Sequence, residues 1–182
     1  MQLALDILLT ALSILVIGSH AVVGKNHFKS KQMPAGANLV SAAVLTTLGV
    51  FLLLLWTGEA PLGAQLVALA LEALSLWIFF RTITASRDGA LHFAFDTENP
   101  VSLVTSGPYR YVRHPFYTSY LIFWTGLAIG TWSLWAVPVL VLMVVLYTVA
   151  ARGEEAKFMR TGMSEDYAAY RARTGMFWPK IM

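Results

Sequence analysis

The chain has 182 residues, of which 57% are hydrophobic and 13% are charged, and its formal net charge is +3. Soluble domains carry about twice that charged fraction, and a water-soluble domain of this length could not hide so much apolar surface. The composition therefore predicts an all-α, polytopic membrane protein. The sequence contains no cysteine, which excludes disulfides, cysteine-ligated zinc and thiol nucleophiles.

Apolar stretches long enough to cross a bilayer, about 20 residues each, alternate with polar connections. Five transmembrane helices are predicted, at residues 3–23, 37–56, 62–85, 117–129 and 134–151. The first stretch carries Asp6 and has no basic region before it, so we interpret it as a retained span and not as a cleaved leader. We expect one membrane domain over residues 1–182, with residues 152–182 as a polar C-terminal region.

The basic residues predict how the chain is oriented. With five spans, all 13 lysines and arginines fall on one side of the membrane. Because basic residues are enriched in cytoplasmic loops, we expect this side to be cytoplasmic, with the N-terminus outside and the C-terminus inside. A prokaryotic inner membrane is the expected location. The polar segments 86–116 and 152–182 then share the cytoplasmic side, where they are expected to form a ligand pocket.

The stretch "GPYRYVRHPFYTSY" at residues 107–120 is basic, aromatic and rich in proline. Pro115 suits the first turn of the following helix, which places His114 at the mouth of that helix. Backbone donors there favour an anion, and Arg110 and Arg113 add positive charge nearby. The segment could therefore hold an anionic, planar ligand such as a nucleoside-bearing cofactor. The alternative is an interfacial belt of arginine and tyrosine that only anchors the span.

Acidic residues occur at two unusual places. Glu154 and Glu155 follow the fifth predicted span, where the helix dipole favours cations, so we interpret them as ligands for a hydroxyl pair, an ammonium or a sulfonium. The alternative is a solvated turn in which Arg152 pairs with Glu155. Glu72 lies inside the third span, where an ionisable group is costly, and we favour a neutral acid that is hydrogen-bonded to a hydroxyl or to His20. No histidine has a partner at metal-ligand spacing, so no metal site is predicted.

Two stretches, "LVTSGPYRYVRHPFYTSYLIFWTG" and "RGEEAKFMRTGMSEDYAAYRARTGMFWP", resemble the isoprenylcysteine carboxyl methyltransferase family over roughly residues 80–179. That family groups with the phospholipid methyltransferases among integral-membrane methyltransferases. The resemblance implies that the motif and the tail form a site for S-adenosylmethionine. The matching cofactor positions are Leu103, Val104, Gly107, Tyr111, Arg113, His114, Pro115, Tyr117, Glu154 and Glu155. Arg152 and Glu155 match residues expected near the reacting centre.

The resemblance implies an enzyme that methylates a lipophilic or lipidated acceptor from the bilayer, with membrane lipids and no nucleic acid as partners. Carboxyl O-methylation of an isoprenylcysteine-like substrate is expected first, and phospholipid N-methylation or thiol S-methylation are alternatives. An ionised carboxylate needs no base and Arg152 could orient it, whereas an amine or a thiol would need His114 or a glutamate of the pair as base. Two alternatives of another class are an NADPH-dependent membrane reductase and a non-enzymatic membrane subunit.

Overall fold

The computed structural model describes residues 1–27, 35–87, 100 and 102–180. Over these residues every long element is a helix, which confirms the predicted all-α class. The elements are α1 (Gln2–His27), α2 (Ala35–Thr57), α3 (Leu62–Ser86), the short 3-10 helix η1 (Gly107–Arg110), α4 (Pro115–Thr131), α5 (Ala136–Phe158) and α6 (Ser164–Arg173). Much of the predicted polar segment 86–116, including His92, lies outside the described residues.

Four of the helices are long and apolar enough to cross a membrane. The candidate spans are Gln2–Val23, Asn38–Thr57, Leu62–Ser86 and Ala136–Phe158, and each coincides with a predicted span. The helix at the fourth predicted span, α4, has 17 residues. At about 1.5 Å per residue it is somewhat shorter than a hydrocarbon core of about 30 Å. α5 continues beyond Ala151 to Phe158, so Glu154 and Glu155 belong to the same continuous helix as the fifth predicted span.

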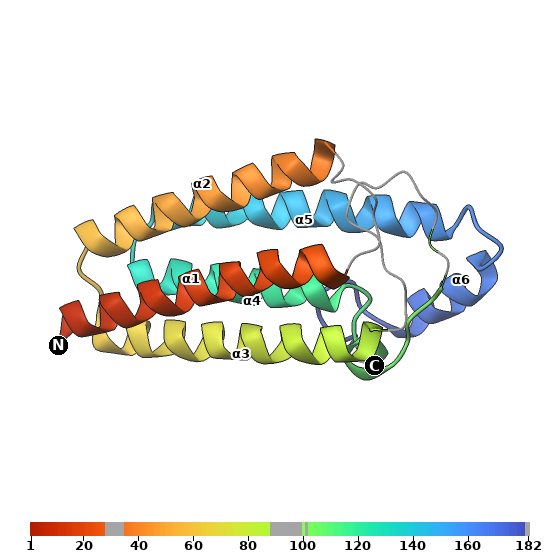
Figure 1. Cartoon of the computed structure of the whole chain (residues 1–182), viewed down its shortest axis with the longest axis horizontal. Helices are drawn as coiled ribbons and strands as arrows, with labels where there is room; N and C mark the ends of the chain where they lie inside the picture. Colours follow the sequence, from red (N-terminus) through yellow and green to blue (C-terminus); the bar gives the residue numbers. More distant parts are fainter. Residues whose placement is uncertain (28–34, 88–99, 101, 181–182) are drawn as a thin grey trace.

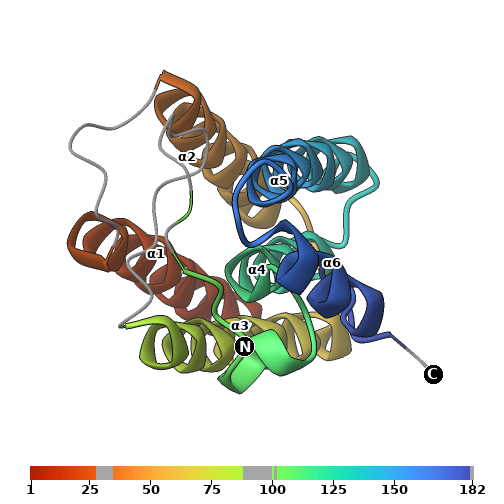
Figure 2. The ribbon, with the colours of Figure 1, turned by 90° about the vertical axis from the view of Figure 1, so that its right-hand side faces the viewer.

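The long helices run side by side along the length of the molecule (Figure 1). The N-terminus and the α2–α3 and α4–α5 connections lie at one end, while η1, α6 and the C-terminus lie at the other. Figure 2 shows α4 in the middle of the bundle, and α4 contacts α1, α2, α3 and α5. The start of α4 therefore meets the end of α5 and the C-terminal region at a single end of the molecule.

The most extensive helix pair, α3 with α4, depends on small residues. A Cβ atom added to Gly126 would lie 2.9 Å from Cβ of Leu71, and one added to Gly130 would lie 2.9 Å from Cβ of Ala68. Glycines four positions apart let two membrane helices approach closely and gain van der Waals contact. This packing fixes α4 and therefore the position of the motif at its N-terminus.

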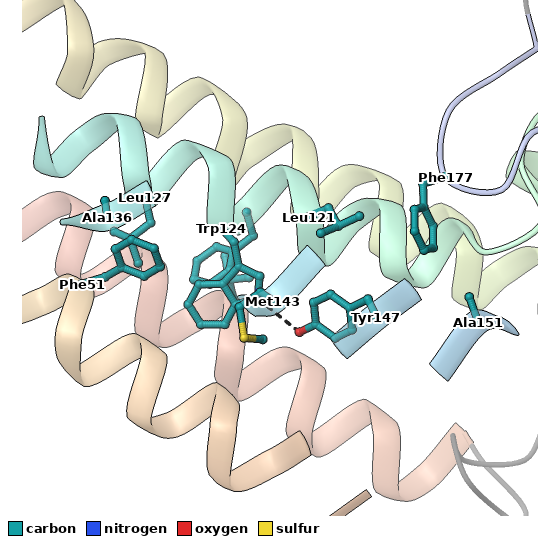
Figure 3. Packing of buried hydrophobic residues seen from close by; sticks show 11 residues of the cluster. Phe51, Leu121, Trp124, Leu127, Ala136, Met143, Tyr147, Ala151 and Phe177 are labelled. Atoms are coloured by element: carbon teal, nitrogen blue, oxygen red, sulfur yellow. Dashed lines mark hydrogen bonds between the residues drawn. The ribbon is translucent and has the colours of Figure 1, made fainter. Parts of the chain in front are cut away.

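The apolar core lies between α2, α4 and α5 (Figure 3). The Phe51 ring of α2 stacks on Trp124 of α4 with 5.7 Å between centroids. The Trp124 indole N–H donates a hydrogen bond to the Tyr147 hydroxyl of α5 over 3.1 Å. This bond satisfies a polar atom inside the core and sets the position of Tyr147, which reaches from the core to the candidate site.

Polar side chains lie in the contact between α1 and α3. The Ser13 hydroxyl donates to Oε1 of Glu72 over 2.8 Å, and Glu72 is fully buried. The expected hydroxyl partner of Glu72 is therefore present. His20, the other partner considered, packs its ring on Phe79 at 4.3 Å between centroids.

Candidate functional site

The C-terminal tail is bound to the motif by backbone hydrogen bonds. The amide of Arg113 donates to the carbonyl of Gly175 over 2.9 Å, and the amide of His114 donates to Met176 over 3.1 Å. In return, Gly175 donates to the carbonyl of Tyr111 over 3.2 Å. These bonds surround an isolated parallel bridge between the two segments. Segments that are about sixty residues apart in sequence thus become one rigid unit beside the start of α4.

Side chains of the tail strengthen this attachment. The Tyr170 hydroxyl of α6 donates to the carbonyl of Tyr109 over 2.7 Å, and Tyr170 is buried. The Thr118 hydroxyl of α4 donates to the carbonyl of Phe177 over 2.7 Å. At Gly175 the chain turns so tightly that a Cβ atom would lie 1.6 Å from the carbonyl oxygen of Trp178, so only glycine fits there.

A buried ion pair joins the motif to α5. Nε of Arg113 lies 2.7 Å from Oε1 of Glu155, and the two side chains are only 7% and 6% exposed. Arg113 also donates from Nη1 to the carbonyl of Thr174. The other carboxylate oxygen of Glu155 lies 3.6 Å from Nε of Arg171 on α6. Glu155 is therefore paired across elements, and its position is not explained by a local pair with Arg152.

His114 links the two glutamates. Its Nε2 lies 3.3 Å from Oε1 of Glu155, and its Nδ1 lies 3.3 Å from Oε2 of Glu154. Burial by itself lowers the pKa of His114, but the hydrogen bonds and negative charges of the two glutamates outweigh burial and raise this pKa above its usual value. Because a carboxylate only accepts hydrogen bonds, the form of the ring that fits both contacts is the imidazolium, in which both nitrogens carry a proton, and the raised pKa favours this form. A ring in this state cannot accept a further proton, which argues against His114 as a base.

Glu154 is the more open member of the acidic pair. Its side chain is 30% exposed, whereas that of Glu155 is 6% exposed. The Tyr117 hydroxyl donates to Oε1 of Glu154 over 2.5 Å. The Tyr117 ring stacks on His114 at 5.6 Å and on Tyr147 at 5.4 Å, in both cases nearly parallel. Glu154 is thus held from one side and remains partly open to a ligand from the other.

The predicted residues before this network lie on the approach to η1. Leu103 and Val104 are half-buried. Gly107 begins η1 with φ of +57°, and a Cβ atom there would lie 2.6 Å from Cβ of Ala85. Both the backbone conformation and the contact with α3 therefore require glycine. Pro115 is buried and occupies the first turn of α4, as predicted.

Two predicted residues lie outside the network. Tyr111 is 62% exposed, so most of its surface is accessible to solvent or ligand. Arg152 is exposed on α5, and the described hydrogen bonds and ion pairs of the network do not include it. The structure thus brings together Arg113, His114, Tyr117, Glu154 and Glu155, and leaves Tyr111 and Arg152 at the surface around them.

Sequence reasoning missed Tyr147, Thr174 and Arg171. Tyr147 could have been found, because it precedes Glu154 by seven positions, about two helical turns, and so lies on the same face of α5. Thr174 contributes a backbone carbonyl to Arg113, and a carbonyl leaves no mark in the sequence. Arg171 was one of several exposed basic residues of the tail, and only the docking of α6 selects it.

A family model described as phospholipid methyltransferase matches residues 62–165. The match covers more than half of the chain, from α3 to the first turn of α6. The chain belongs to the phospholipid methyltransferase family. Four of its described helices are also long and apolar enough to cross a membrane, as expected for an integral membrane protein. The matched region contains the motif and both glutamates, and so agrees with the superfamily resemblance found in the sequence.

A similar protein is the cobalt-zinc-cadmium resistance protein CzcN of Cupriavidus metallidurans, which is 39% identical over 80 residues. The aligned part covers 44% of this chain and 37% of that protein, so the chain spans little more than a third of its length. In the described part of this chain, no three histidine, aspartate or glutamate side chains come together as metal ligands.

Proposed function

We propose that this family member transfers a methyl group from S-adenosylmethionine to a lipophilic acceptor at the membrane surface. The observation that carries the proposal is the buried network of Arg113, His114, Glu154 and Glu155. Such a network is costly unless every charge is paired, and it holds one carboxylate, Glu154, in a defined and partly open position. This arrangement suits a ligand with hydroxyls or a positive charge better than it suits anchoring alone.

The chemistry of the network fits this methyl donor. S-adenosylmethionine carries an ammonium, a sulfonium and a ribose hydroxyl pair. The open carboxylate of Glu154 can accept hydrogen bonds from the ammonium or the hydroxyls, and its negative charge attracts the sulfonium. Glu155 is already compensated by Arg113 and His114, so its role is to keep the network in place. The exposed ring of Tyr111 offers a flat face for the adenine, and Leu103, Val104 and Gly107 are expected to line the adenosyl pocket.

When bound, the donor supplies a methyl group that its sulfonium has already activated. The protein then has to align donor and acceptor and exclude water. The stacked rings of Tyr117 and Tyr147, with Phe177 at 6.4 Å from Tyr117, close the network toward the apolar core. We propose that this aromatic wall separates the water-facing donor from the bilayer-facing acceptor.

Three acceptor classes compete. Carboxyl O-methylation of an isoprenylcysteine-like substrate would use Arg152, which is exposed near the end of α5 and free of the network, to orient the carboxylate. N-methylation of a phospholipid amine is supported by the family to which the chain belongs. Thiol S-methylation would require a base that removes a proton from the acceptor, as amine N-methylation would. These acceptors differ in whether a base is required, and this difference can be tested.

We propose that α4 is a fifth membrane-crossing helix, although it is short. Its enclosure by α1, α2, α3 and α5 supports this placement, because the surrounding helices cover most of its surface. The gathering of η1, α6 and the tail at one end supports a cytoplasmic site, with the N-terminus outside and the C-terminus inside (Figure 1). A prokaryotic inner membrane remains the proposed location.

Ligand binding to detergent-purified protein tests the proposal. We expect calorimetric binding of S-adenosylmethionine and S-adenosylhomocysteine in the micromolar range, and loss of binding in Glu154→Gln. The matched control is Glu165→Gln, which neutralises an exposed acid of α6. Absence of binding by both adenosyl ligands would overturn the proposal. Binding of NADPH alone would favour a reductase, and binding of none of the three would favour a non-enzymatic subunit.

A further inference from the structure

The connection between α4 and α5 exposes three large apolar side chains. It consists of residues 132–135, with the sequence Trp-Ser-Leu-Trp, and carries no charge. Leu134 is 88% exposed, Trp135 is 77% exposed and Trp132 is 62% exposed. Neither indole donates a hydrogen bond to a described residue, and neither packs on a described aromatic ring. Contacts within the described part of the protein therefore do not account for these side chains.

The backbone of this connection is strained at Trp132. Its φ of 49° and ψ of 31° lie in the left-handed region, and among the described residues other than glycine it alone has a positive φ. Its amide donates to the carbonyl of Ile129 over 3.0 Å, which ends α4. Glycine, or sometimes asparagine, usually occupies such a position, because a larger side chain there costs free energy. The geometry of the turn therefore does not account for the tryptophan either.

The length of α4 places this connection at the edge of the bilayer core. The 17 residues of α4 span about 25 Å, whereas the hydrocarbon core is about 30 Å thick. Because α4 begins at Pro115, beside the charged network, its other end stops about 5 Å short of the opposite hydrocarbon boundary. Figure 1 shows the α4–α5 connection at the end of the molecule that lies opposite η1 and α6.

We propose that residues 132–135 insert into the boundary between the head groups and the acyl chains of the leaflet opposite the candidate site. The partner of this exposed tip is the lipid surface and not a second protein chain. Tryptophan is enriched at this boundary, because its ring prefers the acyl chains while its N–H bonds to polar head groups. The inference goes beyond methyl transfer and rests on the membrane crossing of α4 proposed above.

The neighbouring α2–α3 connection supports a lipid partner. A Cβ atom added to Gly58 would lie 3.6 Å from the carbonyl oxygen of Thr131, so the two connections are in contact. Trp56 at the end of α2 is 49% exposed. Exposed tryptophans from two separate connections thus gather at the same end of the bundle, which is the pattern of an interfacial aromatic belt.

Insertion at this end sets the height of α4 in the membrane. A helix that is shorter than the hydrocarbon core either thins the bilayer locally or sinks at one end. His114 stands at the N-cap of α4, so a sunken helix would draw the charged network below the water surface. With the tip held at the opposite boundary, the leaflet bends toward the tip and His114 stays where a water-soluble ligand can reach it.

Spin labels on single cysteines measure the depth of the tip. The chain contains no cysteine, so each label occupies one known position. Leu134→Cys is the probe, Glu59→Cys on the α2–α3 connection is the matched exposed control, and Val141→Cys marks the exposed surface of α5. In phosphatidylcholine nanodiscs, the label at position 134 should collide with oxygen, which dissolves in lipid, several times more often than with a water-soluble nickel chelate. The label at position 59 should show the reverse order.

The possible outcomes separate three situations. Equal access of the nickel chelate to positions 134 and 59 would place the tip in water and overturn the inference. Protection of position 134 from both reagents would reveal a covering protein chain and would overturn it as well. Access of the chelate to position 141 would instead contradict the membrane placement of α5, so a wrong depth for the tip and a wrong placement of the bundle are distinguishable.

A second variant separates the indole from the turn. Trp132→Asn removes the indole but tolerates the left-handed conformation. We expect the nickel chelate to reach the label at position 134 more often in this variant, while the unfolding temperature in detergent stays the same or rises. Trp132→Tyr keeps an interfacial ring and should retain the wild-type ratio of oxygen to nickel collisions. An unchanged ratio in Trp132→Asn would show that the indole does not hold the tip in the membrane.

Discussion

Glu155→Gln should destabilise the folded protein strongly, because Glu155 neutralises buried cations. Its carboxylate lies 2.7 Å from Nε of Arg113 and 3.3 Å from Nε2 of His114, and the side chains of Glu155 and Arg113 are only 6% and 7% exposed. The substitution keeps the shape of the side chain and removes its charge. Arg113 and His114 then remain buried with less compensation.

Removing one partner of a buried ion pair costs about 3–5 kcal/mol, whereas an exposed pair contributes about 0–1 kcal/mol. Arg171 provides the internal comparison, because it approaches the same carboxylate at 3.6 Å but is 55% exposed. We therefore expect Glu155→Gln to lower the free energy of unfolding by about 3 kcal/mol. Arg171→Gln should lower it by less than about 1 kcal/mol.

Unfolding in mixed detergent micelles, followed by tryptophan fluorescence, measures both variants. A double-mutant cycle with Arg113→Gln should return a coupling of about 1–3 kcal/mol for the Arg113–Glu155 pair. If Glu155→Gln and Arg171→Gln have equally small effects, the Glu155 site is hydrated in solution and the reasoning from burial is wrong.

Three further predictions concern His114, the α3–α4 contact and Tyr117. The pKa of His114 is raised in the folded state above the ordinary histidine value of 6.5. Its contribution to stability is therefore fully present below pH 6.5 and is lost as the pH rises through the folded pKa. The unfolding temperature of the wild type should therefore fall as the pH rises through this pKa, while that of His114→Gln should change less. Gly130→Val should cost about 1–3 kcal/mol by forcing α3 and α4 apart, whereas Gly49→Ala, where no atom lies within 4 Å of the new Cβ, should not destabilise the protein. Tyr117→Phe keeps the stacked ring but removes the hydrogen bond to Glu154, so S-adenosylmethionine affinity measured by calorimetry should fall about tenfold while the unfolding temperature changes little.

The layout of the membrane helices could be read from the sequence because hydrophobicity is a local property. A run of apolar residues near 20 positions long predicts a span whatever surrounds it, and four such runs coincide with candidate spans of the structure. The start of α4 at Pro115 was equally local, because proline suits the first turn of a helix. The α3–α4 contact was not anticipated, although Gly126 and Gly130 stand four positions apart in the sequence.

The candidate site was only partly accessible from the sequence. The motif and the acidic pair stood out because arginine, histidine, proline and paired glutamates are unusual beside apolar spans, and the family resemblance linked the two stretches. Which group bonds to which was decided by tertiary packing. The docking of the tail brings Arg113 to Glu155, places a carboxylate on each nitrogen of His114, and leaves Arg152 outside the network. Pairing between side chains about forty residues apart depends on helix rotation and depth, which local residue patterns do not encode.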